Sequence, residues 1–126
     1  MSLRNAGLKK AFLAGAAIAA NRLIKFGTDD RTMIPAAAAG DSIVGASDEV
    51  GCASGERFDV VLAGIATVDF GGTITRGALI TSDSVGRAIT ATATAGTNIR
   101  TCGIALASGV LGDKGPVLLI PGSFQG

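Results

Sequence analysis

Few residues of this chain could carry out chemistry, and histidine is absent from the sequence. Its absence excludes Ser-His-Asp and Cys-His catalysis, metal binding through imidazole and the commonest proton shuttle near neutral pH. The acidic pairs Asp29-Asp30 and Asp48-Glu49 could supply oxygen ligands to a hard cation, but neither pair has the spacing of a calcium-binding loop. We therefore interpret both pairs as solvated turns and predict no catalytic, metal-binding or cofactor-binding site.

Two further clusters imitate functional motifs. Gly112-Asp113-Lys114-Gly115 surrounds a lysine with glycines, but it lacks the GxxxxGK(S/T) pattern of a phosphate-binding loop, and no helix is expected after it. Ser82-Asp83-Ser84 has no base partner that could activate a serine. Both clusters are typical of turns between strands, where short polar side chains hydrogen-bond to the nearby backbone.

The two cysteines and the net charge set further limits on function. Cys52 and Cys102 form no CxxC motif, which argues against a zinc knuckle or a thioredoxin-like site. Buried free thiols are our preferred interpretation, with a disulfide or a functional thiol as alternatives. The net charge is only +1, far from the basic excess that nucleic-acid binding requires, so we expect no nucleic-acid partner.

The composition predicts a single small domain with a light core. Of the 126 residues, 48% are apolar, but many of these are alanine, and only five Phe and no Trp or Tyr supply large buried areas. The 19 glycines favour tight turns and short strands over long helices. Because so small a fold has a thin stability margin, we expect a partner to contribute stability.

Short apolar stretches alternate with Gly, Asp, Ser and Thr at intervals of roughly ten residues, as in all-β sandwiches and barrels. Ala63-Gly64 is expected to form a tight reversal or a bulge. The spacing from Gly45 to Gly64 recurs from Gly103 to Gly122, which suggests a strand-loop-strand unit used twice around one core. The predicted strands are 22–26, 31–36, 42–46, 57–63, 65–70, 78–81, 87–92, 99–107 and 116–120.

The N-terminal segment has basic residues followed by an Ala-rich run. Lys9 and Lys10 precede residues 11–20 in an order that imitates a secretory signal, but the run is short and continues directly into a strand-like segment. It is also too short to span a bilayer, so we expect no membrane partner. We predict an N-terminal arm over residues 1–20, or a first strand docked on the domain or on a neighbour. A β-sandwich or barrel domain is predicted over residues 21–126.

Several Gly-containing strand and turn segments stand out along the domain: Gly40–Gly45, Gly64–Ala66, Arg76–Asp83, Gly86–Ile89, Gly103–Leu106 and Gly112-Asp113. Together these segments resemble the capsid cement or decoration proteins of tailed phages, some of which are described as phage-associated recombinases. The recombinase description has no support in these residues, because an ATP-driven recombinase needs a nucleotide-binding motif.

The resemblance implies a β-sandwich or barrel, jelly-roll-like in some members, that binds the outer face of the assembled shell as dimers or trimers. It implies no enzymatic activity. The expected partners are the phage major capsid protein and further copies of the chain itself. The expected location is the outer surface of the virion capsid, after synthesis in the host cytoplasm.

We hypothesise that residues 3–26 form a principal contact with the capsid or with a neighbouring subunit. Apolar side chains would act as anchors, and basic side chains would meet an acidic shell surface. The expected contact residues are Phe12, Leu13 and Ile18 as anchors and Arg4, Lys9 and Lys10 as the basic group.

Two other classes of protein remain as alternatives. One is a different β-structured part of the virion, in the tail or the head-completion complex. The other is a secreted adhesive or carbohydrate-binding module. The absence of Trp and Tyr argues against the second class, since sugar faces are usually held by stacking on aromatic rings.

Overall fold

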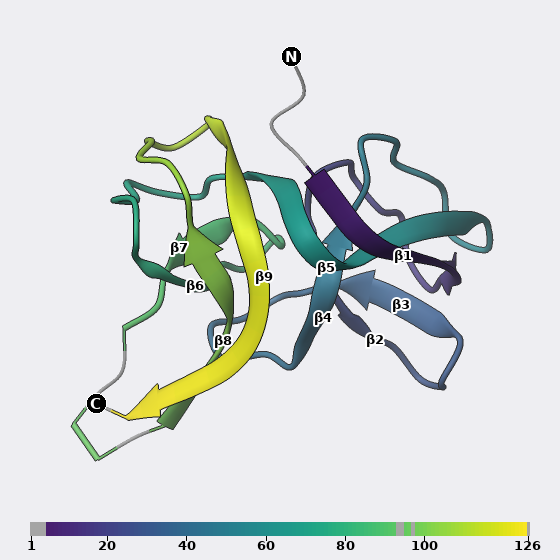
Figure 1. Cartoon of the computed structure of the whole chain (residues 1–126). Coiled ribbons are helices and arrows are strands. Elements are labelled where there is room, and N and C mark those ends of the chain that lie inside the picture. Colours follow the sequence, from purple (N-terminus) through teal and green to yellow (C-terminus); the bar gives the residue numbers. More distant parts are fainter. Residues whose placement is uncertain (1–4, 93–94, 97, 126) are drawn as a thin grey trace.

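The computed structural model describes residues 5–92, 95–96 and 98–125. Over these residues the chain forms a 9-stranded sheet and no helix, and hence no helix that could cross a membrane (Figure 1). The predicted all-β fold is confirmed, and its architecture is a barrel. In chain order the strands are β1 (Asn5–Ala14), β2 (Leu23–Phe26), β3 (Thr32–Pro35), β4 (Ile43–Ser47), β5 (Arg57–Asp69), β6 (Leu79–Ser82), β7 (Ala88–Thr90), β8 (Asn98–Ala105) and β9 (Lys114–Gln125).

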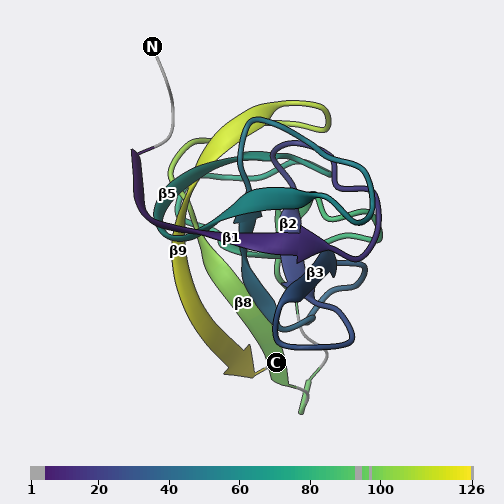
Figure 2. The ribbon, with the colours of Figure 1, turned by 90° about the vertical axis from the view of Figure 1, so that its right-hand side faces the viewer.

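Strands β1 to β5 form a closed barrel in the order β1-β3-β2-β4-β5. The ring closes because β1 pairs in parallel with β3 and antiparallel with β5 (Figure 2). Phe12, Ile24, Met33 and Phe58 are buried inside this barrel. Along β1, buried Phe12 alternates with exposed Leu13, as expected for a strand with one face on a core.

Within the predicted arm over residues 1–20, β1 completes the barrel, which fits the alternative of a first strand docked on the domain. Ile18, farther along the same segment, is buried and forms a bridge with Cys52. The strand is hard to recognise in the sequence because alanines weaken the alternation of apolar and polar residues that normally marks a strand.

The second half of the chain forms a similar unit that shares β5 with the first barrel. The order continues β5-β9-β8-β6-β7, and a parallel bridge between Phe70 and Ala88 brings the end of β5 next to β7. The predicted break at Ala63-Gly64 is therefore not a reversal, since β5 runs through it as one strand of 13 residues. Gly64 has a φ of +93°, opposite a register shift in β1, so the bulge alternative fits. Figure 1 shows β5 between the two halves.

The two halves form an internal repeat that includes many more residues than the Gly45–Gly64 and Gly103–Gly122 spacing noted in the sequence. The N–H of Gly55 donates to the carbonyl of Ala14 at 2.7 Å, and the N–H of Gly112 donates to that of Phe70 at 3.1 Å. The antiparallel bridge between Ile18 and Cys52 is matched by one between Ile74 and Gly109. Further corresponding pairs are Leu23 and Leu79, Gly45 and Gly103, Arg57 and Lys114, and Val60 and Val117.

At one matched pair of positions, each half carries a single phenyl ring, but on opposite strands. In the first barrel Phe58 is buried on β5, and β1 carries the small Ala14. In the second half the large ring is Phe70, the counterpart of Ala14, and Gly115 stands where Phe58 would be. A Cβ added to Gly115 would lie 2.4 Å from Cζ of Phe70. The exchange keeps one ring at this matched pair of positions in each half, as the close packing of protein interiors requires, and the first barrel also holds the buried ring of Phe12.

Two corresponding glycines let hairpin strands approach closely. A Cβ added to Gly45 on β4 would lie 2.1 Å from the carbonyl oxygen of Val61 on β5, and one added to Gly103 on β8 would lie 2.1 Å from that of Leu118 on β9. Any side chain at these positions would push backbone against backbone.

We expect Gly45→Ala to lower the free energy of unfolding by about 1–3 kcal/mol, because the overpacked hairpin must open. The matched control is Gly72→Ala, since a Cβ at Gly72 meets nothing within 4 Å. Denaturant unfolding of both variants provides the measurement. Equal stability of the two variants would contradict the close-approach role of Gly45.

Asp83 organises the turn between β6 and β7. Its carboxylate accepts hydrogen bonds from the N–H groups of Val85 and Arg87 at 2.9 Å each and from Nε of Arg87 at 2.7 Å. Burial opposes ionisation of this carboxyl, but the hydrogen bonds and the Arg87 charge outweigh burial and lower its pKa. The ionised form of Asp83 therefore stabilises the fold.

Because the pKa is lower in the folded chain, the stabilisation is complete above the usual value of 3.8 and is lost as the pH falls through the folded pKa. We expect Asp83→Asn to lower the free energy of unfolding by about 1–2 kcal/mol at neutral pH. The difference from the unsubstituted chain should shrink below pH 3.8. Denaturant unfolding across pH, with the exposed Asp30→Asn as control, measures both effects; a pH-independent difference would refute this role.

Candidate functional site

The structure brings no catalytic or metal-binding constellation together among the residues it describes. Within them no group of three or more Cys, Asp or Glu side chains is placed to hold a metal ion. Of the two acidic pairs, Asp29 accepts a hydrogen bond from the N–H of Arg31, and Asp48 forms an ion pair with Lys9. Both pairs therefore have local structural partners.

Neither cysteine is an activated nucleophile. Both thiols are free, with Cys52 half-buried and Cys102 buried in the second half of the chain. Burial raises the pKa of Cys102 to about 12, and burial together with the charge of Glu56 raises the pKa of Cys52. At neutral pH both residues are neutral thiols, so they act as small apolar side chains.

The expected contact residues of the N-terminal segment fall into two groups. Phe12 and Ile18 are only 7% and 3% exposed, so their side chains pack inside the first barrel. Leu13 is 37% exposed, and Lys9 and Lys10 lie on the surface. Arg4 lies outside the described residues. The alternation along β1 explains the division, because every second side chain must point into the barrel.

The two lysines differ in their local partners. Nζ of Lys9 lies 2.5 Å from the carboxylate of Asp48, so its charge is already compensated. Nζ of Lys10 lies 5.4 Å from the centroid of the Phe12 ring, a cation–π contact that leaves its charge available to a partner. Lys10 is therefore the stronger candidate for binding an acidic surface.

Two arginines that sequence reasoning missed lie beside Lys10 and Leu13. Arg57 is the cross-strand partner of Leu13, and the N–H of Leu13 donates to the carbonyl of Arg31 at 2.9 Å. These residues line one depression at the end of the first barrel, together with Asp30. We call Lys10, Leu13, Arg31 and Arg57 the β1 surface.

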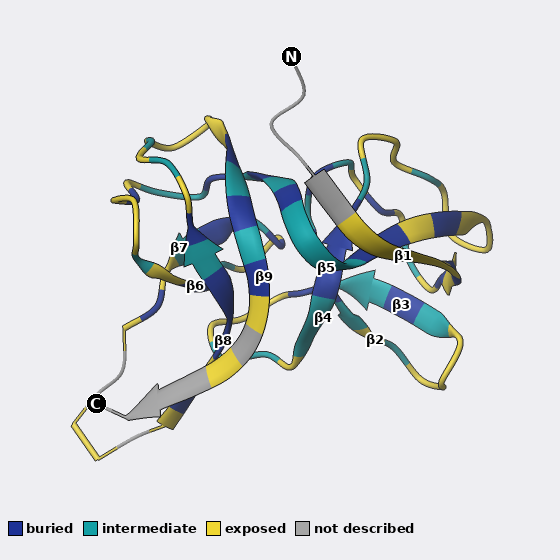
Figure 3. Ribbon diagram, viewed as in Figure 1, coloured by how far each residue is buried: buried dark blue, intermediate teal, exposed yellow. Residues whose placement is uncertain are grey.

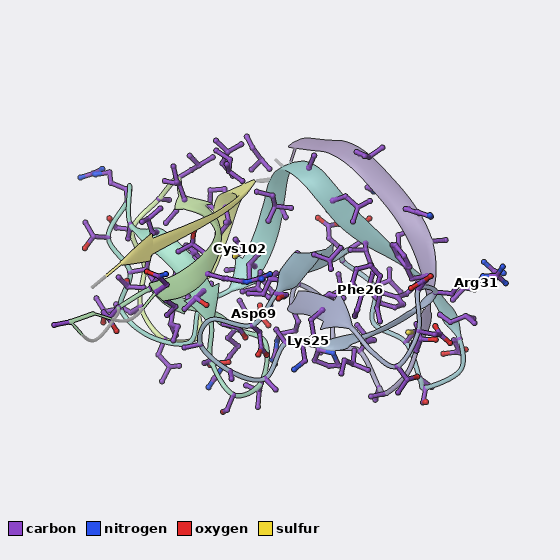
Figure 4. The ribbon with its side chains drawn as sticks, turned by 90° about the horizontal axis from the view of Figure 1, so that it is seen from below. Lys25, Phe26, Arg31, Asp69 and Cys102 are labelled. Atoms are coloured by element: carbon purple, nitrogen blue, oxygen red, sulfur yellow. The ribbon has the colours of Figure 1, made fainter. Side chains whose placement is uncertain are left out.

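Both arginines of the β1 surface are exposed, and neither forms an ion pair with another described residue. Figure 4 shows Arg31 at the far end of the first barrel, away from Cys102. Arg31 and Arg57 are far apart in the sequence, so only the pairing of β1 with β3 and β5 brings them together. The arrangement suits an acidic protein surface, which arginine can bind through paired hydrogen bonds.

Comparisons with known proteins agree with one another. A family model described as phage cement protein matches residues 4–118. A solved structure described as the head fiber gp8.5 N base in bacteriophage phi29 has a TM-score of 0.65 and 20% sequence identity, covering 90% of this chain and 93% of that chain. At this identity the second match shows a shared fold. No curated protein matches the sequence.

Proposed function

The chain belongs to the phage cement protein family, and on this premise we propose that it binds the outer surface of a phage head and stabilises the lattice of the major capsid protein. Family membership makes the chain a capsid-associated structural protein of the virion. It favours a head component over a tail part or a secreted adhesive module. The proposal further includes synthesis in the host cytoplasm, no enzymatic activity, and no nucleic-acid or membrane partner.

The β1 surface is the proposed contact with the shell. Its arginines and Lys10 carry positive charge without an ion-pair partner among the described residues, and Leu13 adds an exposed apolar side chain between them. Charge complementarity of this kind sets the orientation and speed of association. Lys9 can contribute at the edge, while Phe12 and Ile18 support the surface by holding the segment in the barrel.

A cement role also fits the energetics of the fold. The buried side chains are mostly Ala, Val and Ile, with few large rings. A modest contact made by each copy is multiplied over the lattice, because a capsid subunit that is bound at several places dissociates less readily. Binding to the native shell in turn stabilises the bound state by mass action. Association of the chain with itself, as a dimer or trimer, would add to this effect.

We expect the purified protein to bind saturably to mature heads that lack it and to raise the temperature at which those heads release their contents. Co-sedimentation measures the binding, and heating of the loaded and unloaded heads measures the reinforcement. A head preparation with its own cement protein in place is the control. No binding to heads, or binding without added heat resistance, would count against the proposal.

Deleting residues 1–20 would remove a barrel strand, so point substitutions test the β1 surface better. We expect the double variant Arg31→Glu with Arg57→Glu to weaken head binding by about tenfold or more, equal to about 1.4 kcal/mol or more, because it places acidic groups against an acidic shell. Arg76→Glu is the matched control, since Arg76 is an exposed arginine in the second half. Equal losses in both proteins would place the contact elsewhere.

A further inference from the structure

A row of apolar side chains crosses the outer face of the second half. Leu79 on β6, Ile104 on β8 and Leu118 on β9 are direct cross-strand partners, and Ile65 on β5 is the next partner of Leu118. Directly paired residues lie on the same face of a sheet. Leu79 is 39% exposed, and the other three are half-buried. Figure 3 shows buried and half-buried residues alternating along β9.

Further apolar residues extend this row. Ile120, two positions beyond Leu118 on β9, is 46% exposed, and Leu106, just after β8, is 43% exposed. Among the described residues, charge lies at the border of this row, where Asp69 on β5 pairs with Lys114 on β9 at 3.0 Å. We call Leu79, Ile104, Leu118, Ile65, Ile120 and Leu106 the outer face. A contiguous apolar face with a charged border is typical of a surface that another protein covers.

The internal repeat shows what covers such a face. In the first half the corresponding row is Leu23 on β2, Ala46 on β4 and Val61 on β5, joined by the same cross-strand pairing. These side chains are 0%, 0% and 1% exposed, and they belong to the core of the second half of the chain. The first copy of the row is thus already an interface, and its partner is a barrel unit of this same fold.

The second copy of the row has kept the character of an interface. Where the first half has Ala46 and Val61, the second has the larger Ile104 and Leu118. A face that stays in water gains nothing from larger apolar side chains, whereas an interface gains buried area from them. We propose that the outer face binds a second copy of this chain.

A second copy fits this face better than the shell does. The covered counterpart in the first half is packed by the chain's own fold, and interfaces between identical subunits are more apolar than transient contacts. The charged β1 surface, by contrast, suits a partner of opposite charge. This inference builds on the self-association included in the proposed function by naming the residues that carry it.

Sedimentation velocity over a range of concentrations tests the inference. We expect the unsubstituted chain to self-associate and the double variant Leu79→Glu with Ile120→Glu to weaken that association by about a hundredfold. Val50→Glu is the matched control, because Val50 is a 77% exposed apolar residue of the first half. The milder pair Leu79→Ala with Ile120→Ala should weaken association by about tenfold, and thermal unfolding verifies that each variant folds.

The results separate this inference from the proposed function. If the unsubstituted chain stays monomeric at its highest soluble concentration and still binds heads, the inference is wrong and the cement role stands. If the chain associates through the outer face but does not bind heads, the inference stands and the proposed cement role is wrong. Association that survives both double variants, or that Val50→Glu weakens equally, also overturns the inference. So does a loss of head binding by the glutamate variant with self-association intact, because the outer face would then contact the shell.

Discussion

Backbone pairing along β5 is the constraint on which the rest of the structure depends. The first part of β5 pairs with β1 and β4 and closes the first barrel. Its last part pairs with β9, a strand of the second half. One strand thus serves two units, so neither half has a complete set of hydrogen-bond partners without it. Asp69 reinforces the junction at the end of β5, where it pairs with Arg22 at 2.9 Å and with Lys114 at 3.0 Å.

The small side chains of the sequence have a structural purpose in this arrangement. Glycine at positions 45 and 103 allows neighbouring strands to approach closely, and the rings of Phe58 and Phe70 fill matched places in the two halves. A core of this kind stabilises the fold more through dense packing and backbone hydrogen bonds than through large buried areas. The β1 surface and the outer face differ in character. The β1 surface is basic and lies at the end of the first barrel, whereas the outer face is apolar and crosses β6, β8, β9 and β5.

Local patterns in the sequence predicted most strands, whereas long-range pairing decided the rest. Predicted strands 22–26 and 31–36 contain β2 and β3, because each is a short apolar run next to the polar, Gly-containing segment 27–30. Gly64 split β5 in the prediction, since sequence alone does not distinguish a bend from a turn. At the candidate site Lys10 and Leu13 could be proposed from the N-terminal segment. Arg31 and Arg57 could not, because they reach that site only through the register of β1 with β3 and β5.

The order of the strands along the chain also bears on how the protein is made. All the strands of the first barrel precede residue 70, so this barrel can close while the second half is still being synthesised. It then presents the unpaired edge of β5 and the bare row of Leu23, Ala46 and Val61 to the emerging chain. The second half can therefore assemble on a preformed template, and its own row of Leu79, Ile104 and Leu118 is complete only once β9 is in place.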